Sequence, residues 1–371
     1  MKNSAHLPKI KALVIPLNWG LGHATRLIPV ISELQKMNVS VIAGGSPVHQ
    51  KLFQQQFAGL ETIDFPHLNI RLTGKRTQVF SLAFQVPAFL FQICREHRAL
   101  KRVIKEKEID IVISDNCYGL WNPSVYSVFI THQLHIKLPS RLRVFRHLIN
   151  RMNTYFIRKF DECWVPDIPE MEGFAGKLSH TNNSTAKYIG ILSRFNLLNK
   201  AAELQEHGSV KRILFILSGP EKQRNLFEEC IRKEIAAVQD EFDYTVIRGL
   251  PDHNKISDEK WINHADMYEM ASLISRADMI VCRAGYSTIM DLISLGRTAV
   301  LIPTPGQTEQ EYLADFLEKK GYFLTYLQKE FRLKTAIPDF TKFRKRKKPI
   351  STYTTNTLLT DALKNLPALK A

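Results

Sequence analysis

Hydrophobic positions along the chain form short apolar runs that alternate with longer amphipathic segments. This alternation is typical of βαβ units and parallel sheets. In the first half it predicts helices at 27–37, 78–107 (interrupted at Pro87) and 141–159, and strands at 12–17, 39–43, 61–65, 109–114, 127–131, 162–165 and 187–191.

The alternation restarts at residue 212, after a polar stretch at 196–208. Two successive doubly wound sheets leave a crevice beside their strand carboxyl ends, where ligands bind. The expected fold class is therefore α/β, with Rossmann-like domains at 1–192 and 193–350 facing a cleft, and a terminal helix within 351–371. The second half predicts strands at 212–217, 244–248, 279–282, 299–303 and 322–325, and helices at 222–238, 266–275, 287–295 and 308–319.

Composition narrows the class of protein. With 44% apolar and 23% charged residues among 371, the chain is predicted to be globular. Its five cysteines lie far apart without a CxxC pair, which indicates neither a disulfide framework nor a zinc site. The N-terminus lacks an apolar signal segment and the most apolar stretch, 79–94, is interrupted by polar residues, so we expect a cytoplasmic protein. A net charge of +15 attracts anions without choosing among them.

The first motif is NWGLGHATR at 18–26, between a predicted strand and a predicted helix. Gly20 and Gly22 would let backbone N–H groups approach a ligand, and the following helix N-terminus favours an anion. The same GxG pattern also fits an ordinary tight turn. His23 could take a proton from an attacking hydroxyl, although a lone histidine is more often structural.

The second motif covers 277–315, where two predicted strands each end in a loop that opens a helix. The first helix would present N–H groups and the hydroxyls of Ser287 and Thr288 to a diphosphate, and Asp291 could accept hydrogen bonds from a ribose. Gln310 and Glu311 carry amide and carboxylate groups suited to sugar hydroxyls. Alternatively, Asp291 and the glutamates are capping charges.

These two stretches resemble the glycine-rich opening and the nucleotide-sugar motif of glycosyltransferase family 28, the MurG-like transferases of the GT-B superfamily. The resemblance implies an acceptor-side N-terminal domain and a donor-binding C-terminal domain. It also implies an inverting transfer of a hexose or N-acetylhexosamine from a UDP-sugar to a hydroxyl acceptor. Such enzymes use the UDP-sugar as co-substrate, with no metal and no other cofactor.

Position by position, the resemblance and the motifs give two sets of site residues. Three side chains are candidates for the base that deprotonates the acceptor, and the choice among them stays open: His23, Asp115 and His132. The donor-binding candidates are Gly20, Gly22, Arg194, Ser218, Gly219, Met267, Arg283, Gly285, Ser287, Thr288, Asp291, Gln310 and Glu311. Arg194 or Arg283 would stabilise the leaving diphosphate.

The sequence departs from the family pattern in ways that concern the sugar. The first loop has one glycine fewer, and SGPEKQR at 218–224 replaces a loop richer in glycine. The ribose acid is Asp291 instead of a glutamate, and Glu311 stands where the family has a second glutamine. Because a carboxylate and an amide favour different hydroxyl arrangements, the identity of the sugar stays open.

Charged and aromatic residues give the evidence on the acceptor. In 77–102, phenylalanines precede several arginines and a lysine, a mixture that suits the interface of an anionic membrane. A lipid-linked acceptor, and a peripheral position on the inner face of the cell membrane, follow as hypotheses. The alternative is a core helix interrupted at Pro87. The basic run at 342–348 is expected to be solvated, and we expect no nucleic acid because no nucleic-acid-binding motif accompanies it.

Two other functions fit the same fold class. A nucleotide-sugar 2-epimerase would need additional carboxylates around the sugar, for which Asp115 and Glu311 are the only obvious candidates. A non-catalytic protein that binds a nucleotide-sugar or a polyanion would need no base. The linear order of the motifs favours the transferase.

Overall fold

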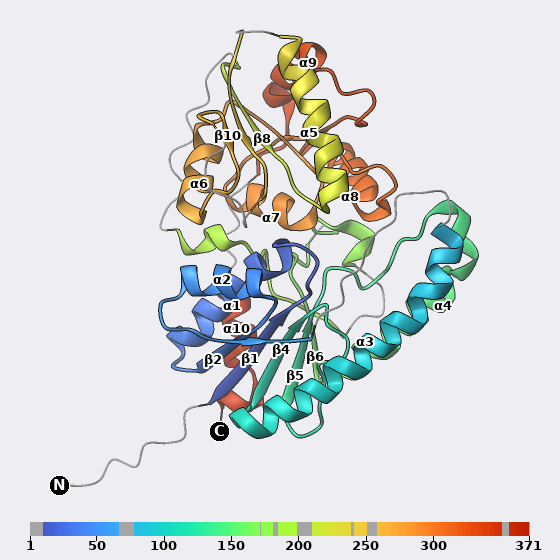
Figure 1. Cartoon of the computed structure of the whole chain (residues 1–371), viewed down its shortest axis with the longest axis vertical. Helices are drawn as coiled ribbons and strands as arrows, with labels where there is room; N and C mark the ends of the chain where they lie inside the picture. Colours follow the sequence, from blue (N-terminus) through green and yellow to red (C-terminus); the bar gives the residue numbers. More distant parts are fainter. Residues whose placement is uncertain are drawn as a thin grey trace, which may run out of the picture. The chain divides into compact units, whose positions relative to one another are not determined.

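The structure is a computed structural model that describes residues 10–66, 78–170, 172–180, 185–198, 210–238, 241–250, 258–350 and 356–370. The chain forms two compact units (Figure 1). The N-terminal unit comprises 1–173, 177–192 and 355–371, and the C-terminal unit comprises 174–176 and 193–354. Each unit contains one parallel sheet, which confirms the predicted α/β class.

The sheet of the N-terminal unit has the strand order β3-β2-β1-β4-β5-β6-β7. The order reverses direction between β1 and β4, whose last residues, Pro16 and Asp115, are register partners. A reversal of this kind is the place where doubly wound sheets bind ligands at their carboxyl edge. The strands are β1 (Lys11–Pro16), β2 (Ser40–Gly45), β3 (Glu61–Asp64), β4 (Ile111–Asp115), β5 (Tyr126–Ile130), β6 (Glu162–Val165) and β7 (Lys187–Tyr188).

The helices of this unit correct several expectations. The first begins at Gly22, five positions before the predicted start, so His23 lies in its first turn. The long helix continues through Pro87, because a proline removes one hydrogen bond without always ending a helix. The helix expected at 141–159 starts with a 3-10 turn, and the helix at 47–56 was not predicted. The bounds are α1 (Gly22–Lys36), α2 (Pro47–Gln56), α3 (Gln78–Lys107), η1 (Ser140–Phe145), α4 (Arg146–Ile157), η2 (Gly176–Leu178), α10 (Asn356–Lys364) and η4 (Pro367–Leu369).

The C-terminal helix α10 belongs to the N-terminal unit, although the sequence places it after the other domain. Figure 1 shows it beside α1. The Thr360 hydroxyl donates a hydrogen bond to Glu33 of α1 at 3.0 Å. The last helix therefore completes the layer that carries the first glycine loop.

The sheet of the C-terminal unit has the order β10-β9-β8-β11-β12-β13, with its reversal between β8 and β11. The strands are β8 (Arg212–Ile216), β9 (Asp243–Ile247), β10 (Trp261–Ile262), β11 (Met279–Cys282), β12 (Val300–Leu301) and β13 (Leu324–Thr325). The helices are η3 (Arg194–Leu197), α5 (Glu221–Ala236), α6 (Met267–Arg276), α7 (Tyr286–Ser294), α8 (Thr308–Lys319) and α9 (Leu333–Arg346). Strand β10 and helix α9 were not predicted.

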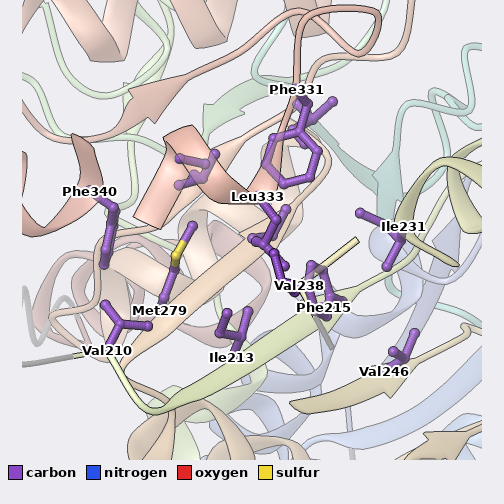
Figure 2. Packing of buried hydrophobic residues seen from close by; sticks show 14 of the residues in the cluster. Val210, Ile213, Phe215, Ile231, Val238, Val246, Met279, Phe331, Leu333 and Phe340 are labelled. Carbon is purple, nitrogen blue, oxygen red and sulfur yellow. The ribbon is translucent and has the colours of Figure 1, made fainter. Parts of the chain in front are cut away.

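Helix α9 changes the interpretation of the basic run at 342–348. Phe340 and Phe343 are buried in the core of the C-terminal unit, together with Leu333 and Phe331 (Figure 2). Most of the run therefore lies at the end of an amphipathic helix, where Phe343 is buried while most of the cations are exposed, as expected for a solvated run. Its cations stand at a helix C-terminus, where positive charge is favourable.

Candidate functional site

Four polar side chains meet at the carboxyl edge of the N-terminal sheet, and we call them the His23 cluster: His23, Arg26, Asp115 and His132. Asp115 is the last residue of β4, and His132 follows β5 by two residues. His23 and Arg26 lie three residues apart on α1, and side chains at that spacing are neighbours on a helix face. The three predicted base candidates are thus close together, around an arginine that sequence reasoning missed.

Arg26 and Asp115 form a two-pronged ion pair at the centre of the cluster. Arg26 donates from Nε to Asp115 Oδ2 and from Nη2 to Oδ1. Both side chains are buried, with 2% and 0% of their surface exposed. Burial by itself would raise the pKa of Asp115, but the nearby Arg26 and His23 outweigh it and lower the pKa to about 2. Asp115 is therefore an ionised carboxylate whose two oxygens are both engaged.

The two histidines approach this ion pair through their Nδ1 atoms. His23 Nδ1 lies 3.1 Å from Asp115 Oδ1 and 3.0 Å from Arg26 Nη2. His132 Nδ1 lies 3.0 Å from Arg26 Nη1. His132 is buried, whereas 16% of the His23 side chain is exposed. The partly exposed His23 is the member of the cluster best placed to meet a substrate.

The first glycine loop has open space in front of its backbone. Gly20 has a φ of 75°, and a Cβ built there would meet no atom within 4 Å. Gly22 is the first residue of α1, so only Gly20 needs the glycine-specific conformation. The His49 ring, from the unpredicted helix α2, lies with Nε2 3.1 Å from the Gly20 carbonyl oxygen. His49 thus supports the loop from behind.

Glu96 of α3 supports the segment that follows Asp115. Its Oε2 accepts a hydrogen bond from the Gly119 backbone N–H at 2.9 Å, and its Oε1 accepts one from Gln92 at 3.0 Å. Burial raises the pKa of Glu96 to about 7, against these two hydrogen bonds, which lower it. Unlike Asp115, this carboxyl group has neutral hydrogen-bond donors as its partners.

In the C-terminal unit, two strand ends present small-residue turns at the sheet reversal. Ile216 of β8 and Cys282 of β11 are register partners, so the turns that follow them lie at one edge. Gly219, before α5, has a φ of 96° and no atom within 4 Å of an added Cβ. Gly285 is the N-cap of α7. The predicted donor residues of these turns are thus brought together: Ser218, Gly219, Gly285, Ser287 and Thr288.

Arg283 lies inside the unit, behind these turns. Its guanidinium is 3.9 Å from the centre of the Phe227 ring. It donates hydrogen bonds to the carbonyl oxygens of Gln223, in the first turn of α5, and Ile302, after β12, both at 3.2 Å. Burial lowers the pKa of Arg283 to about 10. The side chain therefore ties the backbone of neighbouring strand ends together.

Asp291 and Arg194, predicted as ribose and nucleotide contacts, are neighbours. Asp291 Oδ1 accepts a hydrogen bond from the Ser193 hydroxyl at 2.6 Å, and Oδ2 lies 3.3 Å from Arg194 Nε. The Ser294 hydroxyl donates to Ser193 Oγ at 3.0 Å. Burial raises the pKa of Asp291, although Arg194 and Ser193 oppose the shift. The segment at 193–194 is thereby fastened to α7.

Gln310 and Glu311 fold back onto the loop before α8. Gln310 accepts a hydrogen bond from the Thr304 N–H at 2.9 Å, and Glu311 accepts one from the Gly306 N–H at 2.8 Å. The Glu311 contact fits the capping alternative stated for the glutamates. Met267 is the first residue of α6 and is buried, whereas the next residue, Tyr268, is 68% exposed.

Helices α3 and α4 carry a group of exposed apolar side chains. The two helices are in contact through the rings of Phe89 and Phe156, whose centres are 6.3 Å apart, and Figure 1 shows them side by side. Along the described parts of the chain, no helix has the length and apolarity needed to cross a membrane. We call the exposed group on α3, η1 and α4 the α3–α4 patch: Leu90, Phe91, Val144, Phe145, Leu148 and Tyr155.

Comparison with known proteins shows a family domain in the C-terminal part of the chain and relatives along most of its length. Residues 213–366 match the glycosyltransferase family 28 C-terminal domain. A UDP-N-acetylglucosamine–N-acetylmuramyl-(pentapeptide) pyrophosphoryl-undecaprenol N-acetylglucosamine transferase of Natranaerobius thermophilus is 25% identical over 320 residues, which cover 81% of this chain and 82% of that protein. Residues 213–366 are thus a glycosyltransferase family 28 C-terminal domain, and the chain as a whole resembles the MurG-like transferases of that family. This match favours the transferase over the epimerase and binding-protein alternatives.

Solved structures of glycosyltransferases agree with the fold of this chain. The glycosyltransferase of kitacinnamycin has a TM-score of 0.63 at 15% identity, covering 96% of this chain and 99% of that one. MurG of Acinetobacter baumannii has a TM-score of 0.53 at 15% identity, covering 96% and 95%. The predicted GT-B class, with two Rossmann-like domains, is confirmed.

Proposed function

We propose that this chain transfers a hexose or N-acetylhexosamine, with inversion, from a UDP-sugar to a hydroxyl group of a lipid-linked acceptor. The observation that carries the proposal is the contact between buried Asp115 and partly exposed His23 at the sheet reversal of a chain with a family 28 C-terminal domain. The name of the Natranaerobius relative specifies a UDP-sugar donor and an undecaprenol-linked acceptor. A UDP-sugar donor and a lipid-linked acceptor are therefore the two substrate classes that we propose.

His23 is the proposed base. Asp115 is ionised and orients the His23 ring through Nδ1, which leaves Nε2 to take the proton of the acceptor hydroxyl. As the acceptor oxygen forms its bond to the anomeric carbon, the bond to the diphosphate breaks on the opposite face. The carboxylate then stabilises the imidazolium, as in other carboxylate–histidine pairs.

The C-terminal unit is the proposed donor site. The N–H groups at the N-termini of α5 and α7 would bind the diphosphate. The diphosphate would approach them past Gly219 and Gly285, which have no side chains. Asp291 would accept hydrogen bonds from the ribose, and Arg194 would offset the charge of the leaving group. Gly20, Gly22 and Met267 stay proposed donor contacts, as do Gln310 and Glu311, which would have to exchange loop hydrogen bonds for sugar hydroxyls. Arg283 holds the turns in place.

The α3–α4 patch is the proposed contact with an anionic membrane. Exposed Phe91 and Leu148 would enter the headgroup zone, and the exposed Arg95 and Arg98 of α3 would each add about 1 kcal/mol on acidic lipid. We therefore propose a peripheral position at a membrane surface. The double variant Phe91→Ser/Leu148→Ser should lose flotation with vesicles of phosphatidylglycerol and phosphatidylcholine. Wild type that stays unbound at low salt would contradict this part.

The donor is tested by thermal unfolding with a panel of nucleotides and UDP-sugars. A ligand at 100 times its Kd stabilises the folded state by about 2.7 kcal/mol, so a UDP-specific rise in Tm is expected. Asp291→Ala should abolish that rise, whereas replacement of the exposed Asp315 on α8 should leave it unchanged. Equal shifts with all nucleotides, or a full shift in Asp291→Ala, would overturn the proposed ribose contact.

A further inference from the structure

The His23 cluster holds two histidines on one arginine–carboxylate pair, and nothing in the sequence distinguishes their roles. We propose that Arg26 fixes the proton positions of both rings, so that His23 is the only proton acceptor of the cluster and His132 is a neutral hydrogen-bond donor. Arg26 is thus a positioning residue. Its catalytic meaning rests on the proposed transferase function, while the proton positions themselves can be measured without any substrate.

The proton of His132 is determined by the chemistry of Arg26. A guanidinium has only N–H donors and no acceptor atom. Because His132 Nδ1 lies 3.0 Å from Arg26 Nη1, that nitrogen has to accept, and the ring proton has to sit on Nε2. A doubly protonated His132 would turn an N–H toward another N–H of a cation. His132 is therefore held neutral with its proton on Nε2, which requires Gln133, whose side-chain amide lies 3.5 Å from that nitrogen, to turn its oxygen toward it.

The proton position of His23 is determined by a hydrogen-bond acceptor, whereas that of His132 is determined by a donor. Asp115 is ionised and has only acceptor atoms. Because His23 Nδ1 lies 3.1 Å from Asp115 Oδ1, the contact is attractive only with a proton on Nδ1. Arg26 Nη2 carries two hydrogens, and one of them is donated to the same carboxylate oxygen. The other could be donated to His23 Nδ1 only if the ring proton were on Nε2, and the Nδ1 lone pair would then face the Asp115 carboxylate. The lone pair of His23 is therefore on Nε2, and the two rings are opposite tautomers.

Arg26 also lies next to the positive charge that His23 acquires when it takes the acceptor proton. In the transfer step, the acceptor proton moves to His23 Nε2 while the C–O bond to the acceptor forms and the bond to the diphosphate breaks. Asp115 from β4 and Arg26 from α1 both face the new imidazolium, with neutral His132 beyond the arginine. The Arg26 cation lies 3.0 Å from Nδ1, so the imidazolium forms between this cation and the Asp115 carboxylate.

The direct test is a long-range 1H–15N NMR correlation spectrum of the full chain, labelled with 15N-histidine at pH 7.5. His23→Gln and His132→Gln assign the two rings. Wild type should show a neutral Nδ1–H pattern for His23 and a neutral Nε2–H pattern for His132. A wild-type His132 with its proton on Nδ1, or either ring averaging between tautomers, would overturn the proposal.

Variants of Arg26 test whether the arginine is the cause. In Arg26→Gln, the His132 pattern should average between tautomers. If that variant does not fold, Arg26→Gln/Asp115→Asn removes both charges and should again release the His132 tautomer. The control Lys36→Gln removes an exposed cation from α1 and should change neither ring.

Unchanged rings in a folded Arg26→Gln chain would show that Arg26 is only a structural support, and would refute the proposal. Failure of the transferase function gives a different result. If the tautomers are as stated but no UDP-sugar is hydrolysed or transferred, the proton arrangement stands and the proposed activity is wrong.

Discussion

Arg26 and Arg283 are both buried at the carboxyl edge of a parallel sheet, yet their partners differ. Arg26 faces a carboxylate and two histidines, whereas Arg283 faces carbonyl oxygens and the Phe227 ring. A cation with a counter-charge and titratable neighbours can control proton positions. A cation bound to backbone carbonyls can only hold the backbone. The same side chain, on a helix in one Rossmann-like unit and directly after a strand in the other, thus has surroundings suited to proton control in one and to backbone support in the other.

Replacement of His23 should have the largest effect, and it separates the chemistry of one unit from donor binding in the other. A general base typically contributes roughly 10²–10⁴-fold, so His23→Gln should lower kcat by about that factor. The UDP-induced rise in Tm should stay at its wild-type size. The control His147→Gln, on the surface of α4, should be neutral in both assays. Activity within about threefold of wild type would exclude His23 as the base.

Removal of Arg26 should destabilise the chain through the carboxylate it leaves behind. Breaking a buried ion pair on one side costs about 3–5 kcal/mol, so Arg26→Met should lower the free energy of unfolding by that amount. Asp115→Asn in the same chain should recover part of the loss, because no buried charge then lacks a partner. Urea unfolding of the two single variants and the double variant gives the coupling energy. Strict additivity would contradict the ion-pair interpretation.

Arg283→Met should cost less, because no opposite charge is left behind. The carbonyl oxygens of Gln223 and Ile302 lose their donor, at about 1–3 kcal/mol in total. The variant should also bind UDP more weakly, since the turns before α5 and α7 lose their shared support. Arg276→Met, at the exposed end of α6, should stay within about 0.5 kcal/mol of wild type. If Arg283→Met lowered the free energy of unfolding as much as Arg26→Met does, the proposed difference between the two arginines would be wrong.

Glu96 can be compared with Asp115, because it is a buried carboxyl group whose hydrogen-bond partners are neutral. Its pKa is 4.5 when unperturbed and about 7 in the fold, so the folded state holds the proton longer and stability falls as pH rises from 4.5 to about 7. At about 1.4 kcal/mol per pKa unit, the decline amounts to about 3 kcal/mol. Glu96→Gln should remove it and be the more stable protein at pH 8.

Urea midpoints at pH 5 and pH 8 measure this difference. Glu106→Gln changes an exposed residue of the same helix and should keep the pH dependence of wild type. A Glu96→Gln chain that declines with pH as steeply as wild type would show that the burial of this group does not destabilise the charged form.

The sequence predicted the sheets well because buried strands carry a strong apolar pattern. Asp115 and His132 follow such strands directly, so their shared location could be expected. Arg26 was missed because its partner lies 89 residues away and an arginine after an HxT pattern has no special signal. The role of Arg283 was equally hidden, since its partners are main-chain carbonyls, which any residue provides. The helical spacing of Leu333, Ala336 and Phe340 could have predicted α9, but the charged residues around them obscured the pattern.

The stereochemistry of the reaction tests the central claim most directly. Direct displacement assisted by the His23 base requires inversion at the anomeric carbon. Water can replace the unknown acceptor, so 1H NMR of early UDP-α-N-acetylglucosamine hydrolysis by wild type should show the β anomer first, before mutarotation, and His23→Gln should release little sugar. Initial release of the α anomer would contradict the single displacement and the role assigned to the His23 cluster.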